Sequence, residues 1–370
     1  MSYLPLIETV ATTATRANAS TVDSDGVFPT ATLEAMGPLM GLISATEVGG
    51  MGQGPRAAVD VVTRLAQECA SSAMVVCMHY AGTAVIEAHG SDAVRRDIAA
   101  AKHLTTLAFS EAGSRSHFWA PLSSATRQGD NVRLDAKKSW CTSAHHADSY
   151  VWSSQPTDAD GELSTLWLVP RRTDGLSGPA AFNGLGLRGN DSTPIVADGV
   201  IIPSGNRLGE DGGGFGIMMQ TVLPMFNAMV AATSVGVMNA AIAGTVAHVS
   251  GTRHMHLDSA LRDLPTIRNY VARMKCQADM ASTLLYDTVA AMESGREDTM
   301  LRVLQCKAVC AESALDVTQT AMRVCGGAAY RKDVGVERAF RDSQAASVMG
   351  PTTDVLYDFI GKAVTGMELF

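Results

Sequence analysis

Proline and tryptophan are distributed unevenly along the chain, and this distribution divides it into three zones. Six of the 13 prolines and all four tryptophans lie within residues 105–212, whereas residues 225–370 contain only Pro265 and Pro351. Because proline breaks the interior of a helix, the last zone can form long helices and the middle zone cannot. We therefore predict three domains, at residues 1–104, 105–212 and 213–370.

Helical periodicity marks the first and third zones. Residues 57–70 place a row of apolar side chains on one face, ending at Cys69, and residues 71–89 are almost all small or apolar, as in a buried helix. In the third zone, residues 305–324 carry apolar side chains at helical spacing. Four or five helices of this kind imply an antiparallel bundle.

The middle zone has the period of β-strands. Short alternating runs occur at residues 131–135 (NVRLD), 150–154 (YVWSS) and 164–170 (STLWLVP), with Gly, Asp and Asn turn residues between them. Such runs indicate a small β-barrel or sandwich. The expected fold class is α+β, mostly α, with an N-terminal helical domain, a central β-barrel and a C-terminal helical bundle.

Charge and cysteine content exclude several classes of function. The chain has 29 Lys and Arg against 37 Asp and Glu, a net charge of −8 without basic runs, so we expect no nucleic-acid partner. The seven cysteines include no CxxC pair, and no His lies near Cys306 and Cys310 to complete a zinc set. We therefore expect buried, reduced thiols, no metal site and a cytoplasmic location. No basic and apolar leader and no run of about 18 apolar residues occurs, so we expect neither a signal peptide nor a membrane span.

The low content of charged residues points to an oligomer. Charged residues make up 18% of the chain, below the usual ~25%. A protein with so few charges keeps part of its surface out of water most readily by burying it between subunits.

Five segments, in order along the chain, are similar to the motifs of one enzyme family. Residues 107–116 (LAFSEAGSRS) resemble the TEPGxGSD segment of acyl-CoA dehydrogenases, and residues 138–148 (KSWCTSAHHAD) resemble the family's KxWITNAxxAD. Residues 187–192 (LRGNDS) resemble GxRxSxT, and residues 205–215 (GNRLGEDGGGF) resemble NxLGxxGxGF. Residues 325–342 resemble FGGxGY followed by ExxxRD. One such motif is a weak signal, but five in register identify the chain as a member of this superfamily.

The resemblance implies an FAD enzyme with an N-terminal helical domain, a central β-barrel and a C-terminal four-helix bundle. Members are usually tetramers with a flavin at each interface, which implies a homo-oligomer, a dimer of dimers, acting on a small molecule such as an acyl thioester. Matched position by position, one subunit would line the flavin with Leu107, Phe109, Ser110, Ser116, Trp140 and Thr142. The residues that would reach the FAD of the neighbouring subunit are Arg253, Arg323, Gly326, Gly327, Thr352 and Asp354.

The residue types at these positions suit a flavin. The hydroxyls of Ser110 and Thr142 can donate to the flavin edge, and the indole of Trp140 can stack on the ring, although taken alone it reads as a core tryptophan of the barrel. Arg253 and Arg323 can grip pyrophosphate oxygens bidentately, with solvated helix charges as the alternative.

The sequence departs from the family where the catalytic base is expected. The family removes the proton α to the thioester with a glutamate of a YEGT segment, and Gly350 stands at that position. Some members place this glutamate early in the first helix of the bundle, just before an arginine, and here those two positions hold Phe226 and Asn227. Weak candidates for a displaced base are Asn227, Asp354 and His79. By resemblance, His79 lies in the helix that usually lines the acyl pocket, although a histidine there is more often structural.

These departures leave three interpretations open. The first is a dehydrogenase acting on an unusual acyl-CoA thioester, cyclic or conjugated, because Gly350 and the following proline predict a wide, stiff pocket rim. The second is a flavin-dependent monooxygenase or oxidase on the same fold that uses O₂, as in secondary metabolism. The third is a subunit without a base that pairs with a competent partner chain. The sequence leaves open whether electrons pass to O₂ or to an electron-transfer protein.

Overall fold

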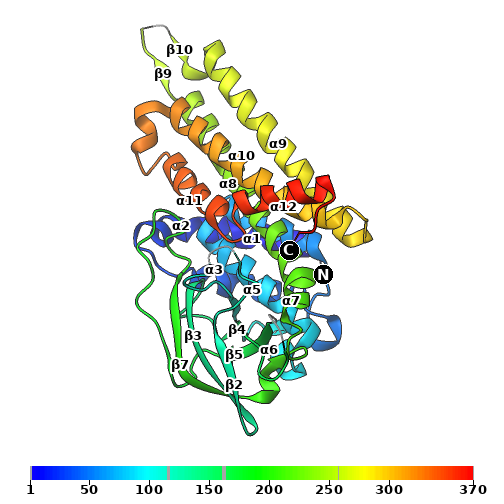
Figure 1. Ribbon diagram of the computed structural model, residues 1–370. Helices are drawn as coiled ribbons and strands as arrows, with labels where there is room; N and C mark the ends of the chain where they lie inside the picture. Colours follow the sequence, from blue (N-terminus) through cyan, green and yellow to red (C-terminus); the bar gives the residue numbers. More distant parts are fainter. Residues whose placement is uncertain (1, 115–116, 161–163, 257, 370) are drawn as a thin grey trace.

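The computed structural model describes residues 2–114, 117–160, 164–256 and 258–369, apart from the side chain of residue 254. The two four-stranded β-sheets lie at one end of the molecule and the long helices at the other, with the N-terminal helices packed beside both (Figure 1). The predicted order of helices, then strands, then helices is confirmed, as is the fold class that it implies.

Six short to medium helices form the N-terminal part. They are α1 (Tyr3–Val10), α2 (Arg16–Ser24), α3 (Thr30–Met36), α4 (Pro55–Ala66), α5 (Ala70–His89) and α6 (Asp92–Ala99). Helix α5 is buried over most of its length, as its apolar composition predicts, and it packs against strand β1 (Thr105–Ala108). The helix expected over residues 57–70 is shorter than predicted, because it ends at Ala66 and Cys69 has extended backbone at the start of α5.

Two four-stranded sheets form the central part. One has the order β1, β4 (Ser149–Ser154), β5 (Thr165–Pro170) and β8 (Arg207–Leu208). The other has the order β2 (Ser124–Gln128), β3 (Asn131–Cys141), β7 (Thr193–Pro203) and β6 (Leu176–Ser177). The pairing is antiparallel except between β1 and β4. Alternate side chains of both sheets, among them Leu134, Trp152 and Trp167, form one core.

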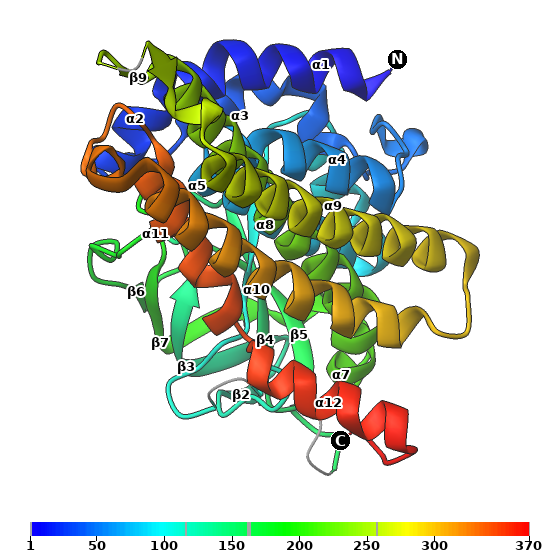
Figure 2. The same ribbon diagram turned by 90° about the horizontal axis from the view of Figure 1, so that it is seen from above.

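Five helices follow a short α7 (Gly214–Ile217) and build the bundle. They are α8 (Leu223–Gly251), α9 (Pro265–Ser294), α10 (Thr299–Cys325), α11 (Val336–Val348) and α12 (Thr353–Thr365). A small hairpin of β9 (Arg253–His254) and β10 (Ser259–Ala260) joins α8 to α9. Helices α9 and α10 pack together along the outer side of the bundle (Figures 1 and 2).

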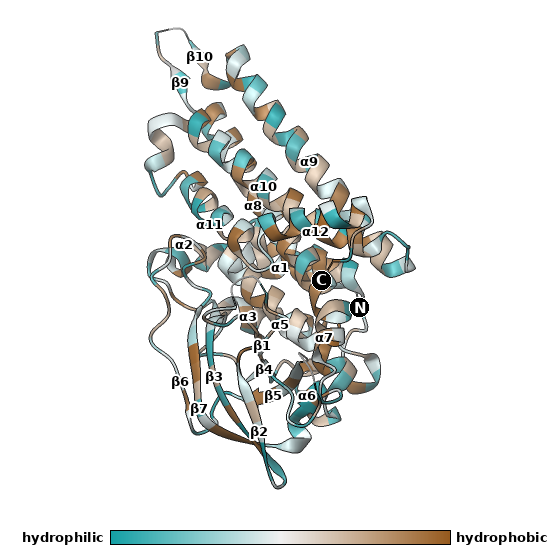
Figure 3. Ribbon diagram, viewed as in Figure 1, coloured by the Kyte–Doolittle hydropathy of each residue, from teal (hydrophilic) through white to brown (hydrophobic). Residues whose placement is uncertain are grey.

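Helix α8 is the central element of the bundle and packs against α4, α5, α9, α10 and α11. At Gly236 it approaches α4 so closely that a Cβ there would lie 2.5 Å from the Thr63 carbonyl oxygen. Within the described residues, only the segment Gly214–Gly251 is long and apolar enough to cross a membrane, and 67% of its apolar window is buried inside the protein. That burial is typical of a core helix. Hydrophobic residues gather around α5 and α8, whereas the tip of the β2–β3 hairpin is hydrophilic (Figure 3).

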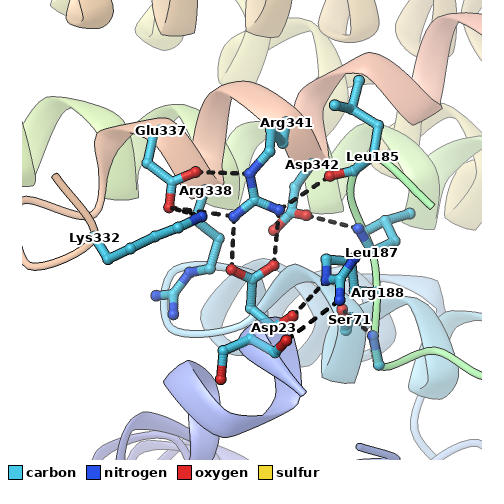
Figure 4. A network of polar contacts seen from close by, with 12 residues as sticks. Asp23, Ser71, Leu185, Leu187, Arg188, Lys332, Glu337, Arg338, Arg341 and Asp342 are labelled. Carbon is cyan, nitrogen blue, oxygen red and sulfur yellow. Dashed lines mark hydrogen bonds and ion pairs between the residues drawn. The ribbon is translucent and has the colours of Figure 1, made fainter. Parts of the chain in front are cut away.

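A polar network joins the three parts of the chain (Figure 4). Arg341 of α11 binds Asp23 of α2, with 2.6 Å between Nη2 and Oδ2, and Glu337 of its own helix, with 2.6 Å between Nε and Oε2. The neighbouring Asp342 accepts a hydrogen bond of 2.7 Å from the backbone N–H of Leu187, in the segment before β7. Residues 337–342 (ERAFRD) of α11 therefore hold the bundle against the N-terminal helices and the β-sheet part.

Candidate functional site

A small cavity lies where the β-sheets, α5, α8 and the loop after α11 meet. Its volume is about 60 Å³. The described residues that line it are mostly apolar and come from six separate segments of the chain: Met78, Leu107, Phe109, Ser110, Phe118, Trp140, Val222, Leu223, Phe226 and Gly350.

This cavity gathers residues that the sequence motifs single out separately. Four of the residues expected to line a flavin, Leu107, Phe109, Ser110 and Trp140, lie on its wall. The two positions at which the family pattern places its catalytic glutamate, Gly350 and Phe226, lie on the same wall although 124 positions separate them in the sequence. The cavity is therefore the candidate active site.

A buried ion pair holds the two flavin motifs together. Lys138 lies against the Glu111 carboxylate and donates a hydrogen bond of 2.7 Å to the Ser153 carbonyl. Burial lowers the pKa of Lys138, and the Glu111 carboxylate opposes this shift. Between the two motifs the backbone N–H of Ser139 donates to the Ser110 carbonyl at 2.9 Å. The ion pair thus helps to position Ser110, which directly precedes Glu111, and Trp140, which follows Lys138 by two residues.

Trp140 is not a core tryptophan. It lies near the end of β3 with 63% of its surface exposed, and its ring centroid lies 4.3 Å from that of Phe182. Thr142 follows just beyond the strand, nearly buried, and its hydroxyl lies 3.2 Å from that of Ser192. An exposed indole, an apolar wall and short hydroxyls are the groups that a flat aromatic ring with a polar edge requires, so these residues fit an isoalloxazine.

A second hollow lies beside α12, and it takes in another of the flavin candidates. It has a volume of about 500 Å³, and Asp354 lies on its wall together with His117, Trp119, Val355, Asp358, Phe359, Lys362 and Leu369. Thr352 precedes α12 in extended backbone. Ser116 lies outside the described residues.

The remaining flavin candidates lie elsewhere in the molecule. Arg253 is in the hairpin at the far end of the bundle from the β-sheets (Figure 1), where it binds the Asp258 carboxylate at 2.6 Å. Arg323 lies near the end of α10, with its guanidinium 5.1 Å from the centroid of the Tyr270 ring. Gly326 and Gly327 follow α10, and a Cβ at either would meet nothing within 4 Å. A single chain does not bring these residues to the cavity.

The weak candidates for a base are not on the cavity wall. His79 is fully buried: its Nε2 lies 3.0 Å from the Met40 carbonyl, and its Nδ1 accepts the Thr105 N–H at 3.2 Å. Burial lowers the pKa of His79 to about 4, so the ring is neutral and structural. Asn227 is also fully buried and donates to the Val303 carbonyl of α10 at 3.3 Å. Asp354 is exposed.

Several wall residues carry no motif and were missed by sequence reasoning. Met78 is one of many apolar residues in its helix. Phe118, Val222 and Leu223 are ordinary apolar residues in the sequence. Met78 could have been found, because it directly precedes His79 in the helix expected to line an acyl pocket. The others become wall residues only through the packing of distant segments.

Comparison with known proteins agrees with this architecture. Models of the N-terminal, middle and C-terminal domains of acyl-CoA dehydrogenase match residues 6–101, 106–200 and 212–365. A similar curated protein is the cyclohex-1-ene-1-carbonyl-CoA dehydrogenase of Geobacter metallireducens, 25% identical over 98% of this chain and 96% of that protein.

Two solved structures show the same fold. Butyryl-CoA dehydrogenase from Megasphaera elsdenii superimposes with a TM-score of 0.91 at 22% identity, covering 98% of this chain and 97% of that one. The prolyl acyl carrier protein oxidase AnaB superimposes with a TM-score of 0.88 at 17% identity, covering 98% of both chains. Because family models match all three parts of the chain in order, the protein belongs to the acyl-CoA dehydrogenase superfamily.

Proposed function

We propose that this protein is an FAD-dependent oxidoreductase of the acyl-CoA dehydrogenase type that acts on an acyl thioester. One observation carries the proposal. Ser110 and Trp140, which belong to two flavin motifs, share a cavity wall with Gly350 and Phe226, the positions at which such enzymes place the glutamate that deprotonates the substrate. FAD, when bound, would be the acceptor of two electrons.

Different residues of the cavity wall would contact the flavin and the acyl chain. Trp140 offers its exposed face to the flavin ring, and Ser110 offers a hydroxyl to the ring's polar edge. Phe118, Phe226 and Leu223 supply an apolar wall that suits an acyl chain.

We propose further that the protein is an atypical member without the usual catalytic glutamate. None of the described residues on the cavity wall is a carboxylate, and the two positions where the family places its base hold a hydrogen and a phenyl group. A thioester whose C–H bond is already acidified by conjugation fits such a site, because it can lose its proton to a water molecule instead of a side-chain base.

The residues of the wall suggest which acyl group the site takes. Gly350 carries no side chain, whereas the rings of Phe118 and Phe226 lie on the same wall. Two phenyl rings on the wall favour a short conjugated acyl group over a bulky ring, although one relative is named for a cyclohexene-carbonyl thioester.

A dye-coupled assay tests this function. The protein, loaded with FAD, is mixed with short saturated, short conjugated and cyclic acyl-CoA esters, and an artificial electron acceptor and mass spectrometry report the loss of two hydrogens. We expect turnover with a short conjugated ester, and Gly350→Glu should extend it to saturated straight-chain esters, because the new carboxylate lies where a base acts. Turnover of saturated esters by the unmodified protein at rates equal to the variant would contradict the missing base.

A second function, an oxidase or monooxygenase, is favoured by the same wall without a carboxylate. A structural neighbour, AnaB, is a prolyl acyl carrier protein oxidase, although at 17% identity its similarity concerns the fold. Oxygen consumption with peroxide release, or transfer of ¹⁸O from ¹⁸O₂ into product, would establish it. Reduction that requires a carrier protein and consumes no oxygen would exclude it.

We also propose that the protein is a homo-oligomer. Arg253, Arg323 and the glycines after α10 lie far from the cavity of their own chain, which suits a role at the flavin of a second copy. Light scattering of the purified protein tests this. A monomer that binds FAD fully would refute it, and a requirement for a different co-expressed chain would favour the hetero-oligomer instead.

A further inference from the structure

A second buried lysine, Lys307 of α10, lies behind the candidate active site. Its side chain has no exposed surface. Its ammonium group donates hydrogen bonds to the carbonyls of Ala346 at 3.1 Å, Met349 at 2.9 Å and Pro351 at 2.7 Å. An ammonium group has three donors, so these carbonyls can use all of them.

Lys307 differs from the other buried lysine, Lys138, in what balances its charge. Lys138 lies against a carboxylate, whereas no ion pair of Lys307 is found within the described part of the chain. A buried charge without a counter-ion is costly, so the hydrogen bonds to the three carbonyls must offset that cost. Ala346 lies in the last turn of α11 and Met349 directly follows that helix, so the ammonium faces the negative end of the helix dipole.

Near neutral pH, the charge that changes at this position is that of Lys307 itself. Helix α10 packs against α8, α9, α11 and α12. The titratable group that acts on Lys307 is Cys306 of the same helix, and burial raises the pKa of that thiol to about 12, so it is neutral. Burial also lowers the pKa of Lys307 to about 7.

The segment that Lys307 holds is the one that contributes Gly350 to the cavity wall. Glycine has no side chain with which to anchor its own backbone, and the chain between Met349 and Thr352 lies between two helices. We propose that Lys307 is a positioning residue: its ammonium group fixes the backbone of residues 346–351 and thereby holds Gly350 at the wall of the active-site cavity.

The strength of this restraint depends on the proton. Hydrogen bonds from a charged donor are roughly twice as strong as neutral ones, and a neutral amine has one donor fewer. The loop is therefore held firmly below neutral pH and loosens above it. The restraint itself is independent of the proposed function, and only its effect on turnover rests on that function.

Hydrogen exchange of the FAD-loaded protein tests the restraint without any substrate. Peptides that cover residues 347–356 are followed at about pH 6 and about pH 8, one unit either side of the Lys307 pKa, and corrected for the intrinsic dependence of exchange on pH. We expect protection of these amides to fall at least about fivefold at the higher pH, since about nine-tenths of the lysine is then neutral.

Variants assign that change to Lys307. In Lys307→Met, protection should be low at both pH values. In Lys307→Arg, whose guanidinium stays charged, it should remain high at both. Lys275→Met, which removes an exposed lysine from α9, is the matched control and should behave like the unmodified protein. Protection in the unmodified protein that does not change with pH, or that survives in a folded Lys307→Met variant, would overturn the proposal.

Steady-state kinetics separate a positioning role from a general loss of structure. Lys307→Met should raise KM for the thioester at low pH to the value that the unmodified protein shows at high pH, and Lys307→Arg should restore the low KM. Equal KM values at every pH, alongside the expected exchange result, would refute the link to the active site but leave the restraint in place. Absence of turnover in all forms would refute the proposed function and not the restraint.

Discussion

Asp342 carries a stability cost that a single substitution should remove. Its carboxyl group is buried in the network between α11 and the segment before β7, and it accepts the Leu187 N–H at 2.7 Å. Burial raises the pKa of Asp342 from 3.8 to about 6, with the Asp23 charge adding to the shift and Arg338 and Arg341 opposing it. Asparagine has nearly the same shape, keeps an oxygen that can accept this hydrogen bond and carries no charge.

The sign and size follow from the two pKa values. Between about pH 4 and pH 6 the folded protein keeps a proton on Asp342 that the unfolded chain has released, so this group lowers the free energy of unfolding as pH rises. Above that window the cost is complete, about 3 kcal/mol for a shift of roughly two pKa units. For 370 residues the entropy of unfolding is about 0.8 kcal/mol/K, so 3 kcal/mol corresponds to about 4 °C in Tm.

Thermal unfolding of Asp342→Asn beside the unmodified protein, at matched scan rates, measures this difference. The variant should gain less than about 1 °C near pH 4 and about 4 °C at pH 7.5. Asp279→Asn, which removes an exposed carboxylate from α9, is the control and should show no such trend. A variant that is less stable than the unmodified protein at pH 7.5, with the same dependence on pH, would refute the reasoning.

Three further substitutions test the site. Trp140→Ala should weaken FAD binding about threefold to tenfold, measured by flavin fluorescence, while Tm changes little because the indole is mostly exposed; loss of the fold instead would place Trp140 in a core. Lys138→Met should destabilise the protein by about 3–5 kcal/mol in urea unfolding, since Glu111 would stay buried without its counter-charge, and Glu111→Gln added to it should recover part of that loss. Phe226→Ala should widen the cavity and shift kcat/KM about tenfold toward longer acyl esters, and an unchanged chain-length preference would remove Phe226 from the substrate pocket.

Periodicity and motifs predict most of the architecture because both depend on neighbours in sequence. The short run of residues 150–154 becomes strand β4, which is buried on both faces although its alternation predicts one exposed face, and the apolar run of residues 71–89 becomes the buried helix α5. The end of α4 was not predictable in this way. Glu68, just after it, binds Arg16 and Arg64 at 2.6 Å and 3.0 Å, so a contact with a distant helix lies at the break.

The site was predictable only where residue type reveals chemistry. Ser110 and Trp140 could be placed at one site from their motifs, and the structure puts both on one wall. The shape of the wall could not be predicted, because Phe118 and Phe226 join Gly350 there only through the packing of distant segments. Lys307 was also missed, since a lysine among apolar helix residues gives no sign of three carbonyls 39 to 44 positions away.

The visible absorption spectrum tests the central claim most directly. The purified protein is loaded with FAD, mixed without oxygen with short conjugated and saturated acyl-CoA esters, and then exposed to air. The account predicts that the yellow colour bleaches with a conjugated thioester and that Trp140→Ala loses much of the flavin during gel filtration. It also predicts that, after exposure to air, the yellow colour returns only when the electron acceptor of the enzyme is present. A protein that retains no flavin, or whose flavin stays oxidised with every thioester, would contradict it.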